Sequence, residues 1–299
     1  MIDPKSLIIP HLQENKTCYV AYSGGVDSTV LLYEVGEAAK DIKCNVVAIH
    51  INHEYSKYSG QWEKHCKSFC KDYGLILKKF SFKSNNLKGA SLESLMREKR
   101  YNIFEKVLSK DEVLFMGHHL DDQIETLFFR MLRGSGLKGS SSIPAKRALG
   151  KGILIRPFLK LSKNDLIEIA KRKKLNYVED ESNNNIEFDR NYLRNEVISK
   201  ISKRWPNYRK SLSKYIDNHK ASYDFLSKTS SQELKNILVK EKINVEKLKE
   251  YDSEYQKILI LNWLESKKFR LPSSQVLEEL TKSFLNTKKT SQPKFIWGS

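Results

Sequence analysis

Short apolar runs and longer helix-like segments alternate along the first 120 residues of the chain. β-Branched and aromatic residues concentrate in four runs, which predict strands at residues 17–22, 44–52, 75–82 and 111–119. Apolar residues at helical spacing fill the intervals and predict helices at residues 28–40, 60–74 and 91–110, with Ser28 capping the first and Gly74 closing the second. Strands that alternate with helices form right-handed βαβ units. The pattern therefore predicts an α/β fold built on a doubly wound parallel sheet.

The pattern becomes more helical after the run ILIRPFLKL. It predicts a helix at residues 162–175, then a polar loop, then a basic helical segment at residues 200–220 that Pro206 interrupts. Residues 201–299 hold 20 Lys or Arg residues against 11 Asp or Glu residues. We therefore expect a first domain at residues 1–200, a basic helical linker at 201–214 and a smaller, mainly helical, basic domain at 215–299.

Charge adds a first functional indication. The formal net charge of the 299 residues is +17, an excess that attracts polyanions, of which nucleic acid is the commonest. The alternative is a lysine-rich genome that places lysine on every solvated surface.

Composition excludes several classes of protein. No apolar run approaches the roughly 18 residues that would span a bilayer, and the first residues lack the features of a secretion signal, so we expect a cytoplasmic protein without a membrane partner. Four cysteines are too few for a disulfide scaffold. Cys66 and Cys70 lie four residues apart beside His65, which is poor zinc spacing without a second pair, so ordinary packed thiols are favoured over a metal.

The connection between the first predicted strand and helix is the hexapeptide Ser23-Gly24-Gly25-Val26-Asp27-Ser28. It lacks the lysine of a Walker A loop. The glycines permit positive φ and expose successive N–H groups, and the helix directs its positive end to the same space. The serine hydroxyls add donors, and Asp27 would hold Mg²⁺ or the turn itself. We interpret the hexapeptide as an anion-binding nest, although the two glycines alone would favour a tight turn without a ligand.

A second polar stretch, GHHLDDQIETLFFRMLRGSGLKG at residues 117–139, follows the fourth predicted strand. With a helix from about Leu120, His118 lies at the strand end, Asp122 and Glu125 lie near one face, and Asp121 points elsewhere. A solvated salt-bridged face is the alternative for DDQIE, whereas the apolar residues around the acids favour a packed helix. Ligands of doubly wound sheets bind beyond the carboxyl ends of the strands, where both polar stretches are placed.

The hexapeptide SGGVDS resembles the PP-loop of the N-type ATP pyrophosphatases, whose fold is adenine nucleotide alpha hydrolase-like and which transfer AMP from ATP to an acceptor oxygen. The resemblance implies that Ser23, Gly24, Gly25, Val26, Asp27 and Ser28 bind ATP and that pyrophosphate leaves. The stretch 117–139, with LESLMREKRYNIF (92–104), RPFL (156–159) and EDESNNNIEFDRNYLRN (179–195), is similar to the tRNA(Ile)-lysidine synthase family over residues 15–200.

That resemblance implies an activity, its partners and its residues. The family uses ATP to replace the C2 oxygen of the wobble cytidine in CAU-anticodon tRNA(Ile) by the ε-amine of free L-lysine, through an adenylated cytidine. Relatives also suggest a homodimer. Arg97 corresponds to a family arginine with a catalytic role, a plain helix-surface arginine being the alternative. We expect Asp122 to act as the base, Glu125 to bind the ammonium group and His118 to lie near the phosphates. Four arginines are expected to contact tRNA or substrate: Arg100, Arg133, Arg190 and Arg194.

The sequence departs from the family pattern at Glu54 and Ser56, where Gly and Arg are usual, and at Met96 and Ser140. An arginine contact from the 50–60 loop is therefore in doubt. Longer relatives carry a further C-terminal domain, so we expect either a short form or a truncated chain. A 2-thiolation enzyme with the same loop is a rival, but such enzymes generally carry a Cys-x-x-Cys pair, which this sequence lacks. A non-catalytic RNA-binding module would explain the charge but not the two polar stretches together.

Overall fold

The computed structural model describes residues 2–53, 58–82, 90–179, 186–286 and 296–297. The chain divides into two compact units, Met1–Asp217 and Asn218–Ser299. The first unit holds a six-stranded sheet and the second is mainly helical.

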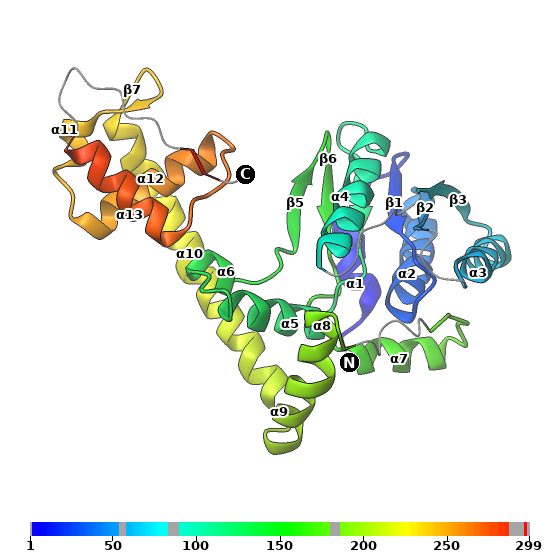
Figure 1. Cartoon of the computed structure of the whole chain (residues 1–299). Coiled ribbons are helices and arrows are strands. Elements are labelled where there is room, and N and C mark those ends of the chain that lie inside the picture. The colour runs from blue at the N-terminus through cyan, green and yellow to red at the C-terminus, as the bar shows by residue number, and fades with distance from the viewer. Residues whose placement is uncertain (1, 54–57, 83–89, 180–185, 287–295, 298–299) are drawn as a thin grey trace. The chain divides into compact units, whose positions relative to one another are not determined.

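The sheet of the first unit has the strand order β3-β2-β1-β4-β6-β5. Figure 1 shows β1, β2 and β3 on one side of this unit and β5 and β6 on the other. Neighbouring strands are parallel except for β5, which runs antiparallel to β6. The strand order changes direction between β1 and β4, and such a switch point opens a crevice at the carboxyl ends of the strands. The strands are β1 (Thr17–Ala21), β2 (Asn45–Asn52), β3 (Ile76–Ser81), β4 (Val113–Phe115), β5 (Lys146–Leu149) and β6 (Gly152–Ile155).

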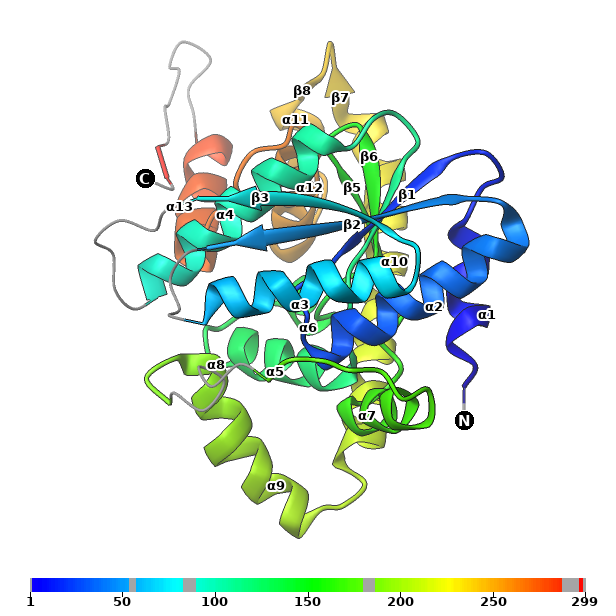
Figure 2. The same ribbon diagram turned by 90° about the vertical axis from the view of Figure 1, so that its right-hand side faces the viewer.

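Helices cover both faces of the sheet, with α4 on one face and α2 and α3 on the other (Figure 2). Side chains of a strand alternate between faces, so Cys18 and Val20 of β1 join the core beneath α2, while Tyr19 packs with Phe104 of α4. The helices associated with the sheet are α1 (Pro4–Ile8), η1 (Ile9–His11), α2 (Val26–Ile42), α3 (Ser59–Asp72), α4 (Ala90–Val107) and α7 (Lys163–Arg172). The predicted doubly wound α/β architecture is confirmed.

Two details differ from the sequence-based prediction. The hairpin of β5 and β6 was not predicted, because both strands have only four residues and β5 begins with the charged pair Lys146 and Arg147. Helix α2 begins at Val26 rather than after a capping Ser28, and Gly25 occupies the N-cap position without a side-chain cap. A glycine N-cap leaves the first N–H groups of the helix available to a ligand.

A smaller helical layer follows the sheet within the first unit. Ile124, Ile198 and Tyr208 form its core, and Ile201 and Leu212 pack against them. Residues 201–214, expected as a linker, therefore lie in the first unit, and the helical segment is interrupted at Pro206 as predicted. The helices are α5 (Leu120–Met131), α6 (Leu137–Ser140), α8 (Asp189–Tyr192), the π-helical η3 (Leu193–Ile198), α9 (Ser199–Arg204) and the first part of α10 (Tyr208–Ile237).

The second unit has a core of its own, centred on the buried leucines Leu248, Leu259 and Leu264. It consists of the rest of α10, β7 (Leu238–Val239), β8 (Lys242–Ile243), α11 (Val245–Leu248), α12 (Ser253–Ser266) and α13 (Ser274–Leu285). Across the described parts of both units, no helix combines the length and apolar character needed to cross a membrane.

Candidate functional site

The SGGVDS turn connects β1 to α2 at the switch point of the sheet. Gly24 has φ +92°, a value that side chains rarely permit, and its carbonyl accepts hydrogen bonds from Val178 N (2.9 Å) and Thr29 Oγ1 (3.1 Å). A Cβ at Gly24 would lie 3.1 Å from Cys66 Sγ. Ser23 and Ser28 face each other, with 3.0 Å between their hydroxyl oxygens. The turn is therefore held rigidly from behind, as an anion-binding nest requires.

Gly117 brings the second polar stretch against this turn. A Cβ at Gly117 would lie 3.0 Å from the backbone oxygen of Asp27, so a side chain there would crowd the start of α2, and glycine lets the segment after β4 approach it closely. Sequence reasoning did not single out Gly117, although its position between a strand and two histidines was a signal. The two stretches expected at one edge of the sheet do lie together there.

A cavity of about 230 Å³ opens between them, here named the nucleotide-side cavity. Ser23, Asp27 and Ser28 line it from the turn, and His118 and Asp122 line it from the second stretch. Apolar walls come from Ile49, Ile51, Phe104 and Met116, and Arg100 also lines the cavity. A pocket with apolar walls and a few convergent polar groups is the usual form of a small-ligand site.

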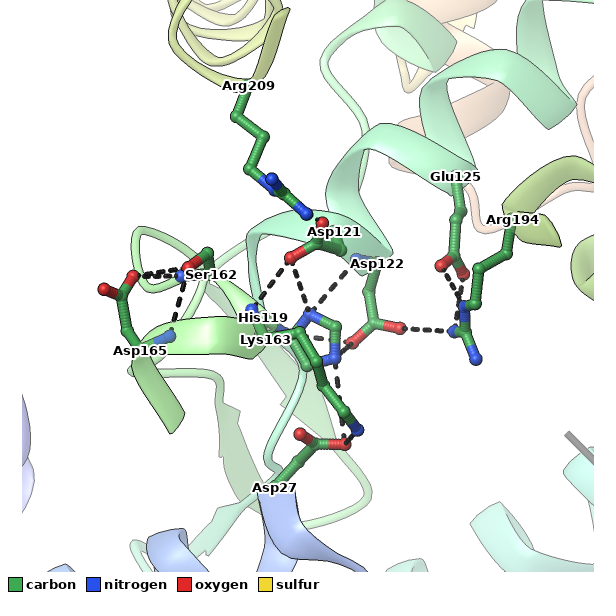
Figure 3. Close-up of polar contacts among 10 residues, drawn as sticks. All are labelled: Asp27, His119, Asp121, Asp122, Glu125, Ser162, Lys163, Asp165, Arg194 and Arg209. Atoms are coloured by element: carbon green, nitrogen blue, oxygen red, sulfur yellow. Dashed lines mark hydrogen bonds and ion pairs between the residues drawn. The ribbon is translucent and has the colours of Figure 1, made fainter. Parts of the chain in front are cut away.

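Asp27 is the carboxylate of the turn. Its Oδ2 lies 2.8 Å from Lys163 Nζ and 3.7 Å from His119 Nε2, whereas its buried Oδ1 has no hydrogen-bond partner among the described residues (Figure 3). An oxygen donor of this kind suits Mg²⁺, which at phosphate sites commonly uses one or two carboxylates and the phosphates themselves. The described residues contain no group of three or more metal-ligating side chains, so Asp27 fits a phosphate-linked ion rather than a protein cage.

His119 begins α5 and organises its acids. Its ring accepts a hydrogen bond from the Asp122 amide (3.4 Å), and Asp122 Oδ2 accepts one from the His119 amide (2.9 Å), which together form a capping box. Burial opposes ionisation of Asp122, but the rings of His119 and His118 and the amide of His119 outweigh it and lower the pKa of this carboxyl. Asp122 is therefore an ionised carboxylate at neutral pH.

Asp121 points away from Asp122, as expected, and it joins three elements. Its Oδ2 accepts a hydrogen bond from the backbone of Lys163 at the start of α7 (2.8 Å), and its Oδ1 accepts one from Arg209 Nε of α10 (2.7 Å). Both carboxylate oxygens are thus occupied, and we interpret Asp121 as a structural residue. Figure 3 shows these contacts radiating from the first turn of α5.

Glu125 lies one turn beyond Asp122 and is almost fully buried, at 1% exposure. Arg194 of η3 holds it through two hydrogen bonds, Nε to Oε1 at 2.6 Å and a terminal nitrogen to Oε2 at 3.0 Å. Burial raises the pKa of the Glu125 carboxyl, and the contacts with Arg194 offset this only in part. The same guanidinium lies 3.9 Å from Asp122 Oδ1, so Arg194 connects the two acids.

Glu125 and Arg194 line a second cavity of about 240 Å³, here named the Glu125 cavity. His119, Asp121, Lys163 and Arg209 also line it, with Ile124, Ile198 and Tyr208 as apolar walls. Asp122 lines the nucleotide-side cavity and Glu125 lines the Glu125 cavity, so the two predicted acids border two distinct spaces.

His118 is held by the buried Arg156 of the RPFL motif. Arg156 Nε donates to His118 Nδ1 (3.2 Å), while its terminal nitrogens donate to the Pro144 carbonyl (2.7 Å) and the Tyr101 hydroxyl (3.3 Å). Burial lowers the pKa of the His118 ring well below its usual range, and the charge of Arg156 lowers it further. Because Nδ1 accepts a bond, the neutral ring carries its proton on Nε2, where it can donate to a ligand.

The remaining predicted residues are more dispersed. Arg97 packs its guanidinium 5.0 Å from the Tyr101 ring centre and lines neither cavity. Arg190 donates to Thr126 Oγ1 of α5 (3.0 Å). Arg133 stacks on Phe129 and lies 3.5 Å from Asp189, away from both cavities. Glu54 and Ser56 lie outside the described residues.

Sequence reasoning missed Arg156, Lys163 and Arg209 as members of the site. RPFL was recognised as a motif, so a signal for Arg156 existed. Lys163 and Arg209 stand in ordinary basic helices, and the sequence alone did not distinguish them from surface residues.

Comparisons with known proteins identify the family to which the chain belongs. Residues 4–201 match the PP-loop domain family. The tRNA(Ile)-lysidine synthase of Buchnera aphidicola subsp. Acyrthosiphon pisum (strain APS) is 38% identical over 95% of this chain and 65% of the relative. Those of Coxiella burnetii (strain RSA 493 / Nine Mile phase I) and Legionella pneumophila (strain Lens) are 32% and 31% identical, over 98% and 97% of this chain and 66% and 67% of the relatives. The chain thus spans about two thirds of the length of these curated relatives.

A solved structure shares the fold. The U34-tRNA thiolase NcsA from Methanococcus maripaludis, with its 4Fe-4S cluster, superposes with a TM-score of 0.56 at 20% sequence identity, covering 72% of this chain and 76% of the thiolase. The family match spans both the SGGVDS turn and the acids of α5, and the curated relatives extend across nearly the whole sequence. The chain therefore belongs to the PP-loop domain family and, within it, to the tRNA(Ile)-lysidine synthases.

Proposed function

We propose that the chain joins L-lysine to C2 of the wobble cytidine of CAU-anticodon tRNA(Ile), with ATP as the activating substrate and AMP and pyrophosphate as products. One observation supports this most strongly: the anion nest and the ionised Asp122 share one cavity, while Glu125 and Arg194 line a second cavity one helical turn away. A reaction that activates an oxygen and then delivers an amine needs two such adjoining spaces.

The first step is adenylation of the cytidine. Its O2 attacks the α-phosphate of ATP, the bond to the β-phosphate oxygen breaks, and pyrophosphate leaves. Membership of the PP-loop family implies the use of ATP. The N–H groups of the SGGVDS turn would hold the departing pyrophosphate, and the Nε2–H of His118 would donate to a phosphate oxygen. Mg²⁺, held by Asp27 and the phosphates, would neutralise charge there when bound.

The second step is attack by the lysine amine. A free ε-amine has a pKa of about 10.4, so only roughly one molecule in 10³ is neutral at pH 7. Asp122, an ionised carboxylate that lines the nucleotide-side cavity, would hold the ammonium group and accept its proton. The amine nitrogen then bonds to C2, the C2–O bond breaks, and AMP leaves.

Glu125 has the complementary task of binding the ammonium group before transfer. Both of its oxygens already accept a hydrogen bond from Arg194, but a carboxylate offers about four acceptor positions, so it can receive an ammonium group as well. For Arg97, a catalytic role stays a prediction from the resemblance. Arg100, which lines the nucleotide-side cavity, is the predicted contact arginine best placed for the nucleotide.

The test incubates the chain with ATP, labelled L-lysine and a tRNA(Ile) transcript with a CAU anticodon. We expect label in the RNA and one AMP released per lysine incorporated. A transcript with UAU is the control, because it lacks the target cytidine. Absence of label with lysine, together with sulfur transfer from a persulfide donor, would replace this proposal by 2-thiolation. An Asp122→Asn variant that formed lysidine at the normal rate would exclude the proposed base.

The partners follow from the same proposal. The second unit contributes basic residues and is proposed to bind the tRNA outside the anticodon, since the tRNA is a polyanion. On the resemblance alone we also propose a homodimer, for which light scattering at several protein concentrations is the measurement.

A further inference from the structure

Three arginines converge on one phenol at the edge of the first unit. Tyr101 of α4 is nearly buried, and its hydroxyl accepts hydrogen bonds from Arg97 (3.5 Å) and Arg156 (3.3 Å). The guanidiniums of Arg97 and Arg147 lie 5.0 and 4.7 Å from the centre of its ring. We name Tyr101, Arg97, Arg147 and Arg156 the Tyr101 cluster. Its members come from α4, β5 and the residue after β6, so only the tertiary fold assembles it.

Among the residues whose side chains the structure describes, no carboxylate pairs with the positive charge of the cluster. In the described part of the chain, none of the three guanidiniums is ion-paired with Asp or Glu; their polar partners there are Tyr101, His118 and the Pro144 carbonyl. Burial raises the pKa of the Tyr101 hydroxyl, yet the three arginines outweigh it and lower that pKa. Such a field repels cations and attracts an anion.

Two of the guanidiniums are open to a ligand. Arg97 and Arg147 are exposed, whereas Arg156 is 3% exposed and uses its nitrogens on internal partners. Each guanidinium has five N–H donors, of which Arg97 uses one on Tyr101. Stacking against one ring orients both arginines, so their side chains lose less conformational entropy when a ligand binds.

We propose that Arg147, together with Arg97, binds a phosphodiester of the RNA strand that carries the target nucleotide, on a platform formed by Tyr101 and braced by Arg156. The proposal rests on the function proposed above and adds to it a contact from the β5–β6 hairpin. Arginine forks match the paired oxygens of a phosphate.

The occupant is an RNA phosphate rather than a phosphate of ATP for a geometric reason. The nucleotide-side cavity is lined by the SGGVDS turn, and none of Tyr101, Arg97 and Arg147 lines it. Tyr101 nevertheless contacts one residue that does, since its hydroxyl lies 3.8 Å from Met116 Sδ, and it shares Arg156 with a second, His118. The cluster thus borders the cavity. If a nucleotide of the RNA were bound in the cavity, the RNA strand on either side of it would continue past the cluster.

The test compares Arg147→Ala with Lys146→Ala. Both changes remove one positive charge from an exposed position of β5, but neighbouring residues of a strand face opposite sides. Arg147 faces the Tyr101 ring, so Lys146 lies on the opposite side of β5, away from the cluster. Unchanged melting temperatures would establish that both variants fold.

Binding of the tRNA(Ile) transcript is measured on filters between about 50 and 300 mM salt, and binding of a non-hydrolysable ATP analogue by calorimetry. For Arg147→Ala we expect a roughly 5- to 10-fold loss of RNA affinity and a salt slope that falls by about 0.7, with unchanged affinity for the analogue. Lys146→Ala should change RNA affinity less than twofold. Arg147→Lys should retain the salt slope but recover only part of the affinity, since it loses the fork.

Three outcomes would overturn the proposal. Equal losses in both alanine variants would indicate a diffuse positive field, loss of ATP-analogue affinity alone would assign the cluster to the triphosphate, and no change would leave it without a ligand role. The proposed function is judged separately by lysine incorporation in the unmodified chain. If Arg147→Ala alone lost RNA affinity while the unmodified chain incorporated no lysine, the Tyr101 cluster would still be an RNA-phosphate site, and only the proposed function would be rejected.

Discussion

Asp122 and Glu125 are one helical turn apart, yet their environments move their pKa values in opposite directions. The rings of His119 and His118 and a backbone amide overcome the burial of Asp122 and lower the pKa of its carboxyl. Glu125 is more deeply buried, and its pKa is raised despite the bidentate contact with Arg194. Paired groups whose environments separate their pKa values are typical of sites that assign different tasks to similar residues.

Asp122→Asn should reveal this arrangement in the pH dependence of stability. A lowered pKa in the folded state means that ionised Asp122 stabilises the fold above its unfolded pKa, near 3.9, and that this contribution is lost as the pH falls through the folded pKa. The parent chain should therefore melt at a higher temperature than the variant at pH 7, and the difference should shrink below about pH 4.

Thermal melts followed by circular dichroism at several pH values provide the measurement. Glu125→Gln serves as the matched variant, because a raised folded pKa gives the opposite sign: ionisation of Glu125 costs stability as the pH rises through that pKa. A difference between the parent and Asp122→Asn that stayed constant from pH 7 to pH 3 would show that the histidines do not stabilise the Asp122 carboxylate.

At the scale of elements, the site depends on how closely the end of β4 meets the start of α2. Gly117 permits that approach, since a Cβ there would meet the backbone of Asp27 and Ser28. Gly136, at the start of α6, has open space instead, because no atom of the described residues would lie within 4 Å of a Cβ at that position. A comparison of substitutions at the two glycines therefore distinguishes the effect of close packing at Gly117 from the general effect of replacing a glycine.

Gly117→Ala should displace the SGGVDS turn and weaken binding of an ATP analogue by about tenfold, because a shift of the nest misaligns several N–H donors at once. Gly136→Ala should leave that affinity unchanged. Calorimetric titration of both variants checks the prediction, and equal affinities for parent and Gly117→Ala would show that the turn tolerates the added methyl group.

For the whole molecule, the net charge of +17 predicts strongly salt-dependent binding to tRNA. If the chain contacts six or more phosphates, its tRNA affinity should fall by about 10³ or more between 50 and 200 mM salt. Filter binding of tRNA(Ile) at several salt concentrations measures this. If log affinity hardly changed with log salt concentration, the alternative in which the lysines only solvate the surface would be favoured. Equal affinity for unrelated tRNAs would show that charge alone does not select the substrate.

Much of the architecture was predictable from residue patterns. The alternation of apolar runs and helical segments predicted the parallel sheet, and the placement of two polar stretches after strands predicted that they would meet at one edge. The β5–β6 hairpin was missed because both strands have only four residues and β5 begins with two charged residues. Because the hairpin was not predicted, Arg147 was not recognised as a candidate residue. It is distinguished from other surface arginines by its contact with the Tyr101 ring, which forms in the folded chain.

Local periodicity and the residue order of the SGGVDS and HHLDDQIET stretches were enough to predict the fold class and to place these two stretches at one edge of the sheet, because each prediction depends on residues that are neighbours in sequence. The tertiary structure decided how those groups are tuned. Asp27 meets Lys163 136 positions away, Glu125 meets Arg194 69 positions away, and His118 meets Arg156 38 positions away. The charge, tautomer and accessibility of a side chain depend on what surrounds it in space, and such partners leave no periodic trace in the sequence.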